Sequence, residues 1–321
     1  MHTRRGSFRK VDHVRYAIVE TTCSVLSREY AEPMAGTAPT ARGWLLIEHP
    51  GPWGAKALTG SRGLDPDIGR AVERAAAAAG FRATLIRSTG RTADLAALRT
   101  VILAWTEPGA TWMRRFTISS AEELGDLDFA ALAGPVEPAI GEPCADPVVL
   151  VCTNGKRDRC CATEGRPLAE ALAHRLPGHV WEATHLGGHR FAPTAVVLPD
   201  GYVYGRLDPD TAVAAYDAAR AGDMRIADCR GRATWKRPAQ AAELAVREDT
   251  GETAADVLRV AAPVEHEDAE HVWTVRVDHV DGRTWTVEVT GRAEEPPRPE
   301  SCGKGFGNPL SMLPRLVTPA L

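Results

Sequence analysis

Residues 179–207 read HVWEATHLGGHRFAPTAVVLPDGYVYGRL. The first six residues form an apolar segment that predicts a β-strand. Two further apolar runs flank Asp200-Gly201, and an Asp-Gly pair favours the tight turn that joins the strands of a β-hairpin. The segment therefore predicts a strand, a polar loop that holds both histidines, and a hairpin.

The neighbouring residues complete one structural unit. PVVLVC (147–152) predicts a buried strand, RPLAEALAHRL (166–176) a helix with Pro167 near its start, and DPDTAVAAYDAARAG (208–222) a capped closing helix. This order of elements is that of the thioredoxin fold. Such folds place a cis-proline before the hairpin, so we expect a cis bond between Ala192 and Pro193.

A similar order occurs earlier in the chain. The patterns predict one strand (43–49), a helix (67–80), three further strands (81–87, 100–105 and 112–118) and a weak helical stretch (121–134). The sequence thus predicts an α/β protein with tandem thioredoxin-like domains. Their predicted bounds are residues 1–140 and 141–225.

The last part of the chain, residues 226–321, predicts a small α+β appendage. Helical patterns at 238–248 and 253–260 precede a hairpin at 271–289, and a glycine-rich tail holds Cys302. A helix-helix-hairpin order could be a DNA-binding winged helix, but acidic residues outnumber basic ones in this region. A structural or partner-binding role is therefore the better interpretation.

Composition limits the class of protein. The chain has 321 residues and a formal net charge of −4, which gives no electrostatic reason to expect nucleic acid or an anionic membrane as partner. No run of 18 apolar residues is present, and no apolar segment follows the basic N-terminus as in a signal peptide. The odd number of cysteines, seven, does not suggest a disulfide framework. We therefore expect a cytoplasmic protein.

Cysteines and histidines gather at predicted strand ends. Cys152 ends one strand, Cys160-Cys161 precede the next helix, and His185 and His189 follow the next strand. In open α/β sheets such positions meet at one edge. Gly187 and Gly188, between the histidines, open backbone conformations that most residues avoid.

Several chemistries use such residues. A zinc protease needs His-Glu-x-x-His, which is absent because Leu186 follows the first histidine. A structural zinc site would pair Cys152 and Cys161 more closely than the eight residues between them. A dithiol oxidoreductase would use Cys152 with Cys160 or Cys161, although the chain has no Cys-x-x-Cys motif. A 2Fe–2S cluster takes ligands from well-separated loops. The structural zinc site, the dithiol oxidoreductase and the 2Fe–2S cluster therefore remain as alternatives at this point.

Two motifs resemble the sucrase/ferredoxin-like family, relatives of thioredoxin-like 2Fe–2S ferredoxins. They are VCTNGKRDRCCATEGRPL (151–168) and HLGGHRFAPTAVVLPDG (185–201), and the similarity covers roughly residues 20–225 and also ESCGK near the C-terminus. The resemblance implies one 2Fe–2S cluster whose ligands, and hence metal-binding residues, are Cys152, Cys161, His185 and His189. The family spacing favours Cys161 over Cys160.

The resemblance implies an electron carrier or redox sensor more than an enzyme in its own right, and an unknown redox partner protein. Histidine ligation raises the potentials of Rieske centres above those of plant-type ferredoxins. We expect the same here, with electron transfer coupled to protons. The flanking Arg157, Arg159 and Arg190 could compensate cluster charge or dock an acidic partner. No pair of carboxylates suggests sugar cleavage.

Overall fold

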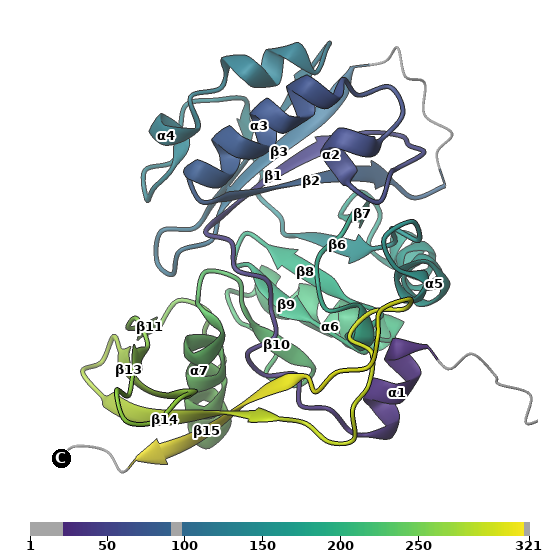
Figure 1. Ribbon diagram of the computed structural model, residues 1–321. Helices are drawn as coiled ribbons and strands as arrows, with labels where there is room; N and C mark the ends of the chain where they lie inside the picture. Colours follow the sequence, from purple (N-terminus) through teal and green to yellow (C-terminus); the bar gives the residue numbers. More distant parts are fainter. Residues whose placement is uncertain (1–21, 91–97, 318–321) are drawn as a thin grey trace, which may run out of the picture.

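The computed structural model describes residues 22–90 and 98–317, which form two β-sheets with helices packed around them (Figure 1). The larger sheet has ten strands in the order β10-β9-β8-β6-β7-β2-β1-β3-β4-β5. The predicted mixed α/β class is therefore confirmed. The basic N-terminal segment used to argue against a signal peptide lies outside the described residues.

The first half of the large sheet follows the predicted order. Its elements are β1 (Gly43–Glu48), α2 (Ala57–Gly60), α3 (Pro66–Ala78), β2 (Phe81–Ser88), β3 (Arg99–Trp105), β4 (Trp112–Ile118), η1 (Glu122–Asp126), α4 (Phe129–Leu132) and β5 (Glu142–Pro143). Strand β1 pairs in parallel with β2 and antiparallel with β3. The weak helical stretch after β4 holds only the short η1 and α4.

The second half repeats this arrangement. Its elements are β6 (Val148–Cys152), α5 (Arg159–Arg175), β7 (Val180–Ala183), η2 (His189–Phe191), β8 (Ala195–Leu198), β9 (Tyr202–Tyr204), α6 (Pro209–Arg220) and β10 (Cys229–Arg232). Strand β6 pairs in parallel with β7 and antiparallel with β8, as β1 does with β2 and β3. The predicted cis bond between Ala192 and Pro193 is present.

The two halves form one continuous sheet. Strands β2 and β7 pair antiparallel, with Arg87 opposite Glu182. Alternate side chains of β1 and β6, such as Leu46 and Leu150, belong to one shared buried core. The other faces are covered separately, by α2 and α3 on the first half and by α5 and α6 on the second. Cys152 at the end of β6 and His185 just after β7 therefore lie near the centre of the large sheet.

A separate five-stranded sheet follows. It consists of β11 (Leu258–Val260), β12 (Val264–Glu265), β13 (Val272–His279), β14 (Thr284–Ala293) and β15 (Leu310–Val317), and α7 (Arg237–Thr250) packs against it. The predicted hairpin around Asp281-Gly282 is confirmed. The predicted helix at 253–260 is wrong, because this segment holds the short strand β11, which pairs with β13.

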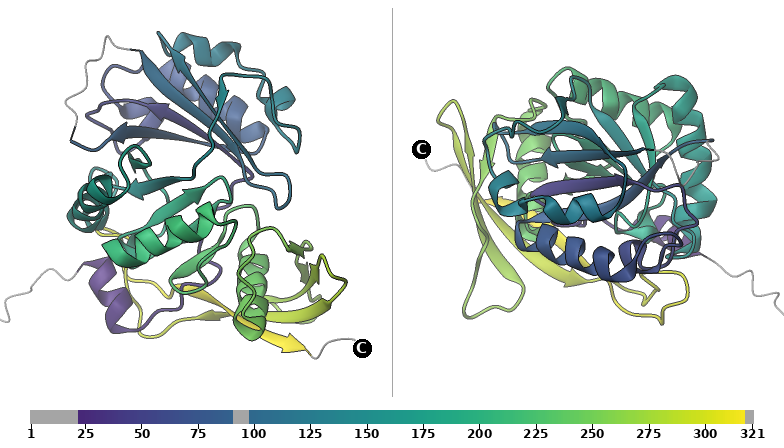
Figure 2. Two further views of the ribbon diagram at one scale, coloured as in Figure 1. Left: turned by 180° about the vertical axis from the view of Figure 1, so that it is seen from behind. Right: turned by 90° about the horizontal axis from the view of Figure 1, so that it is seen from above.

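Two segments that are far apart in the sequence lie beside the second half of the large sheet. Helix α1 (Cys23–Glu29) and the tail between β14 and β15 both lie beside α5 in two opposite views (Figures 1 and 2). The sequence patterns predicted neither this helix nor strand β15. No helix in residues 22–90 and 98–317 has the length and apolar character needed to cross a membrane.

Candidate metal centre

The cysteine doublet lies in the first turn of α5. The helix begins at Arg159, seven residues before the predicted start, and Pro167 lies inside it. Asp158 is the N-cap, and its Oδ1 accepts a hydrogen bond of 2.9 Å from the Cys160 backbone N–H. The sequence pattern placed the start too late because it was read from the apolar spacing and from Pro167, whereas the capping aspartate sets the real start.

A close approach between α5 and β6 positions Cys152. A Cβ added to Gly165 would lie 2.0 Å from the Cys152 carbonyl oxygen, so only glycine fits where the helix crosses the end of the strand. Cys152 is the last residue of β6 and is fully buried. The strand end and the helix start therefore hold Cys152 and Cys161 on the same side of the sheet.

The loop between β7 and η2 turns the two histidines inward. Gly187 and Gly188 have φ values of +86° and +72°, so the predicted need for glycine conformations is confirmed. A Cβ at Gly188 would also lie 2.1 Å from Nη2 of Arg230. The rings of His185 and His189 stack, with centroids 4.3 Å apart.

The structure brings the four predicted ligands together. The Cys161 Sγ lies 3.2 Å from Nδ1 of His189, and the Cys152 thiol interacts with Cys161 and with His185. Nδ1 of His185 is buried and has no hydrogen-bond partner. An unpartnered polar atom in such a place is costly unless it binds something.

The pKa values of three of the four predicted ligands, Cys152, Cys161 and His189, are shifted in different directions. The hydrogen bond from Cys161 lowers the pKa of Cys152 well below its usual range, against the effect of burial, and His185 lowers it further. The pKa of Cys161 is raised, first by the same hydrogen bond and then by burial. Burial and the neighbouring His185 lower the pKa of His189 to about 4. The thiolate of Cys152 and the neutral imidazole of His189 are forms that bind metals, whereas Cys161 would release its proton on binding.

Two arginines that sequence reasoning missed hold the histidine loop. Arg230 on β10 is fully buried and donates 3.0 Å to the Gly187 carbonyl oxygen. Arg82 on β2 donates 2.8 Å to the His185 carbonyl oxygen. Burial lowers the pKa of both guanidinium groups, while the nearby Cys152 opposes that shift. No local motif marks either residue, because each reaches the loop from a distant strand.

A second group of donors lies beside the first. Cys23, Asp158, Cys160 and Cys302 each offer one donor atom, and these atoms all lie within 4.8 Å of one another. Within the described part of the chain, this is the only group of three or more His, Cys, Asp or Glu donors that meets this limit, and the four predicted ligands do not form one.

The protonation of the second group is uneven. The hydrogen bond from the Cys23 thiol lowers the pKa of Cys160 to about 6, and the same bond raises that of Cys23. Burial opposes ionisation of Asp158, but hydrogen bonds from Ser301 and from the Cys160 backbone outweigh it and lower its pKa. The sequence patterns did not mark Cys23 or Cys302 as ligands, yet Cys302 contacts Cys160, with their Sγ atoms 3.3 Å apart.

A comparison with family models decides the relationship. The sucrase/ferredoxin-like model matches residues 34–219. The chain belongs to the sucrase/ferredoxin-like family. No curated protein and no solved structure matches the chain. The family match contains the four predicted ligands and Arg82, but Cys23, Cys302 and Arg230 lie outside it.

A buried ion-pair network ties the family region to the tail. The Glu32 carboxylate, which is 1% exposed, accepts 2.5 Å from Nε of Arg190 and 3.1 Å from Nε of Arg298. Arg190 directly follows His189, so the tail is tied to the histidine loop. Glu300 lies 3.5 Å from Arg190 and adds a second, more exposed pair. Arg190, predicted to flank the ligands, thus serves as a structural link.

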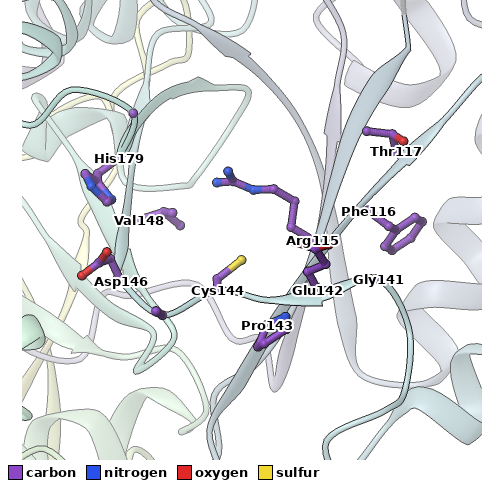
Figure 3. A pocket seen from close by; sticks show the side chains of 12 residues that line it. Arg115, Phe116, Thr117, Gly141, Glu142, Pro143, Cys144, Asp146, Val148 and His179 are labelled. Atoms are coloured by element: carbon purple, nitrogen blue, oxygen red, sulfur yellow. The ribbon is translucent and has the colours of Figure 1, made fainter.

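Two cavities are lined by residues of the family region. One is lined by residues that include Lys56, Arg82, Arg157 and His185, with Glu73 as its one carboxylate. The other contains Cys144, and Figure 3 shows its sulfur and the Arg115 guanidinium pointing into the space, with Val148 and His179 across from them. None of the four predicted ligands lines this second cavity.

Proposed function

We propose that this protein binds a 2Fe–2S cluster through Cys152, Cys161, His185 and His189 and serves as a one-electron carrier or redox sensor. The observation that carries this proposal is the buried Nδ1 of His185, which has no hydrogen-bond partner in a group of two thiols and two imidazoles. When bound, the cluster supplies a site that gains or loses one electron.

The spread of the four donors supports a cluster over a single ion. A structural zinc ion holds four donors tetrahedrally at about 2.0–2.3 Å, so its donors crowd within a few ångströms. The four predicted ligands do not form a group within 4.8 Å of one another. A two-iron cluster is wider than one ion, so its ligands need not all lie within such a limit. The zinc alternative at these residues is therefore the weaker one.

A cluster-free thiol enzyme is the other alternative. The interaction of Cys152 with Cys161 and the lowered pKa of Cys152 favour it, because the thiolate is the reactive form. However, both side chains are only 1% exposed, and thiol–disulfide exchange requires access for a second thiol or disulfide. Burial therefore favours the metal-binding role.

The strand order supports a thioredoxin-like interpretation of both halves. In residues 141–225 the order is β7-β6-β8-β9, and in residues 1–140 it is β2-β1-β3-β4. Each half has one parallel pair followed by antiparallel strands. We propose these as the two domains, with residues 226–321 as the appendage. Fold likeness alone does not fix function, so the cluster proposal rests on the donors.

The cavity that His185 lines is the place where protons could reach the site and where a partner protein could bind. His185 lines it together with Lys56 and Arg157, so an acidic redox protein is the partner that its charge fits. A ligating imidazole has a second ring nitrogen that exchanges protons when its charge environment changes. We therefore propose proton-coupled electron transfer in a reducing cytoplasm, with neither nucleic acid nor membrane as partner.

Oxygen-free purification followed by iron, sulfide and spectral analysis tests the proposal. We expect about two iron and two acid-labile sulfide per chain and a brown colour. Cys144→Ala is the matched control, because Cys144 lies outside both donor groups. A colourless wild-type protein that holds zinc, or no metal, at these residues would contradict the proposal.

A further inference from the structure

We propose that Cys23, Cys160 and Cys302 bind a single thiophilic divalent ion of the Zn²⁺ class, with Asp158 as the fourth donor. The site is distinct from the one formed by Cys152, Cys161, His185 and His189. It does not depend on whether a cluster is bound there.

The three sulfur atoms have the spacing of ligands to one ion. The Cys23 and Cys160 Sγ atoms are 3.4 Å apart, Cys160 and Cys302 are 3.3 Å apart, and Cys302 and Cys23 are 3.6 Å apart. Zn–S bonds of about 2.3 Å in a tetrahedron separate the sulfurs by about 3.8 Å. A disulfide would bring one pair to about 2.05 Å and leave the third sulfur apart. The near-equal triangle favours an ion.

Asp158 completes a tetrahedral donor set. Its Oδ1 lies 4.0 Å from the Cys23 Sγ and accepts from the Cys160 backbone N–H. Its Oδ2 accepts 2.8 Å hydrogen bonds from the Ser301 hydroxyl and from the Cys302 backbone N–H. The Asp158 carboxylate thus caps α5, which supplies Cys160, and is hydrogen-bonded to the segment that supplies Cys302. Such outer hydrogen bonds orient the ligands of metal sites.

The surroundings suit thiolates and an ion. Cys160 lies in the first turn of the 17-residue helix α5, where the helix dipole stabilises negative charge. Cys23 and Cys160 are at most 1% exposed, whereas Cys302 is partly exposed and leaves an entry path. Binding of the ion would replace the thiol protons, which pass to solvent.

The doublet serves two sites because neighbouring helical residues point in different directions. Cys161 belongs to the large core that also contains Trp44 and Leu150. Cys160 belongs to a separate small cluster with Cys23, Ala192 and Cys302. The two sulfurs therefore face different groups of donors, and each donor group needs only one of them.

Metal analysis of the full-length protein and two variants tests the proposal. The wild type is titrated with Zn²⁺, and zinc and iron are measured together after gel filtration. We expect about one tightly held zinc per chain in addition to any iron. Cys302→Ser should lose the zinc and keep the iron and the visible spectrum. Cys144→Ser, the matched control, should keep both.

Cobalt substitution adds a readout of the ligand type. Co²⁺ in the wild type should show intense sulfur-to-metal absorption, and this absorption should weaken in Cys302→Ser and in Cys23→Ser. If Cys23→Ser fails to fold, Cys302→Ser remains informative because Cys302 is partly exposed. Three results would contradict the proposal. The wild-type protein could bind no zinc in addition to any iron, or Cys302→Ser could lose the iron. Mass spectrometry could also show a disulfide among Cys23, Cys160 and Cys302.

Discussion

Cys160 and Cys161 are adjacent in the chain, yet one meets donors from distant segments and the other meets donors from its own half of the sheet. Cys161 contacts His189, 28 residues away. Cys160 contacts Cys23 and Cys302, at separations of 137 and 142 residues. All four donors of the first group, Cys152, Cys161, His185 and His189, come from a single α/β unit, the second half of the large sheet. The second exists only when α1 and the segment between β14 and β15 both reach the start of α5.

The largest expected effect separates the two members of the doublet. Cys161→Ala should abolish the visible spectrum and the bound iron, because a cluster ligand is lost. Cys160→Ala should keep both and lose the zinc equivalent. Paired iron and zinc analyses of the two variants measure this directly. If Cys160→Ala loses the cluster and Cys161→Ala retains it, our assignment of the two sulfurs is reversed.

The pH dependence of the potential tests the histidines of the first group. The potential should fall by about 59 mV per pH unit over part of the range from pH 6 to 10, because one proton accompanies each electron. A redox titration across that range measures the slope. His185→Cys should lower the potential and remove part of the slope. A potential that stays flat in the wild type would argue against histidine ligation with free ring nitrogens.

A glycine substitution tests how tightly the histidine loop is held. Gly188→Ala should destabilise the protein by about 1–3 kcal/mol, because the left-handed conformation is strained and the new Cβ meets Arg230. Gly222→Ala is the matched control, since its φ is +82° but nothing lies within 4 Å of the added Cβ. Denaturant unfolding of the metal-free proteins compares the two. Equal losses would mean that the contact with Arg230 contributes nothing.

The smallest expected effect on the redox potential comes from a change at Asp200, which lies outside both donor groups. This change checks that titration elsewhere in the protein does not cause the pH dependence of the potential. Burial raises the pKa of Asp200, in the β8–β9 turn, to about 6. The unfolded chain therefore ionises first, and stability falls as the pH rises from about 3.8 to about 6. Asp200→Asn should raise stability by about 1–3 kcal/mol at pH 7, since each pKa unit corresponds to about 1.4 kcal/mol.

The gain from Asp200→Asn should vanish as the pH falls below about 3.8, where the Asp200 side chain becomes protonated in both the folded and the unfolded state. Unfolding curves at several pH values follow this trend. The substitution should leave the pH slope of the redox potential unchanged. A gain that persists at low pH would instead point to a packing or hydrogen-bond effect of the amide.

Local sequence patterns predicted those parts of the structure that residues close together in the chain determine. The apolar runs and the Asp200-Gly201 turn gave the strands and the hairpin, and Gly187-Gly188 marked the histidine loop. The second donor group has no local signal that joins its members, because Cys23 and Cys302 lie 279 residues apart and nothing in the ESCGK motif around Cys302 points to Cys23. Arg230 is hidden in the same way. Only tertiary packing brings such residues to the site, and a single sequence does not encode that packing in its periodicity.

The buried Glu32, which joins Arg190 to Arg298, ties the histidine loop to a segment that is synthesised much later. The ribosome releases Glu32 and Arg190 long before Arg298 and Cys302, so the four ligands from 152 to 189 are complete while the tail is still being made. Until then, the Glu32 carboxylate has only one of its two guanidinium partners. The first group of donors is therefore synthesised well before Cys302, and the second can close only after Cys302 has been made.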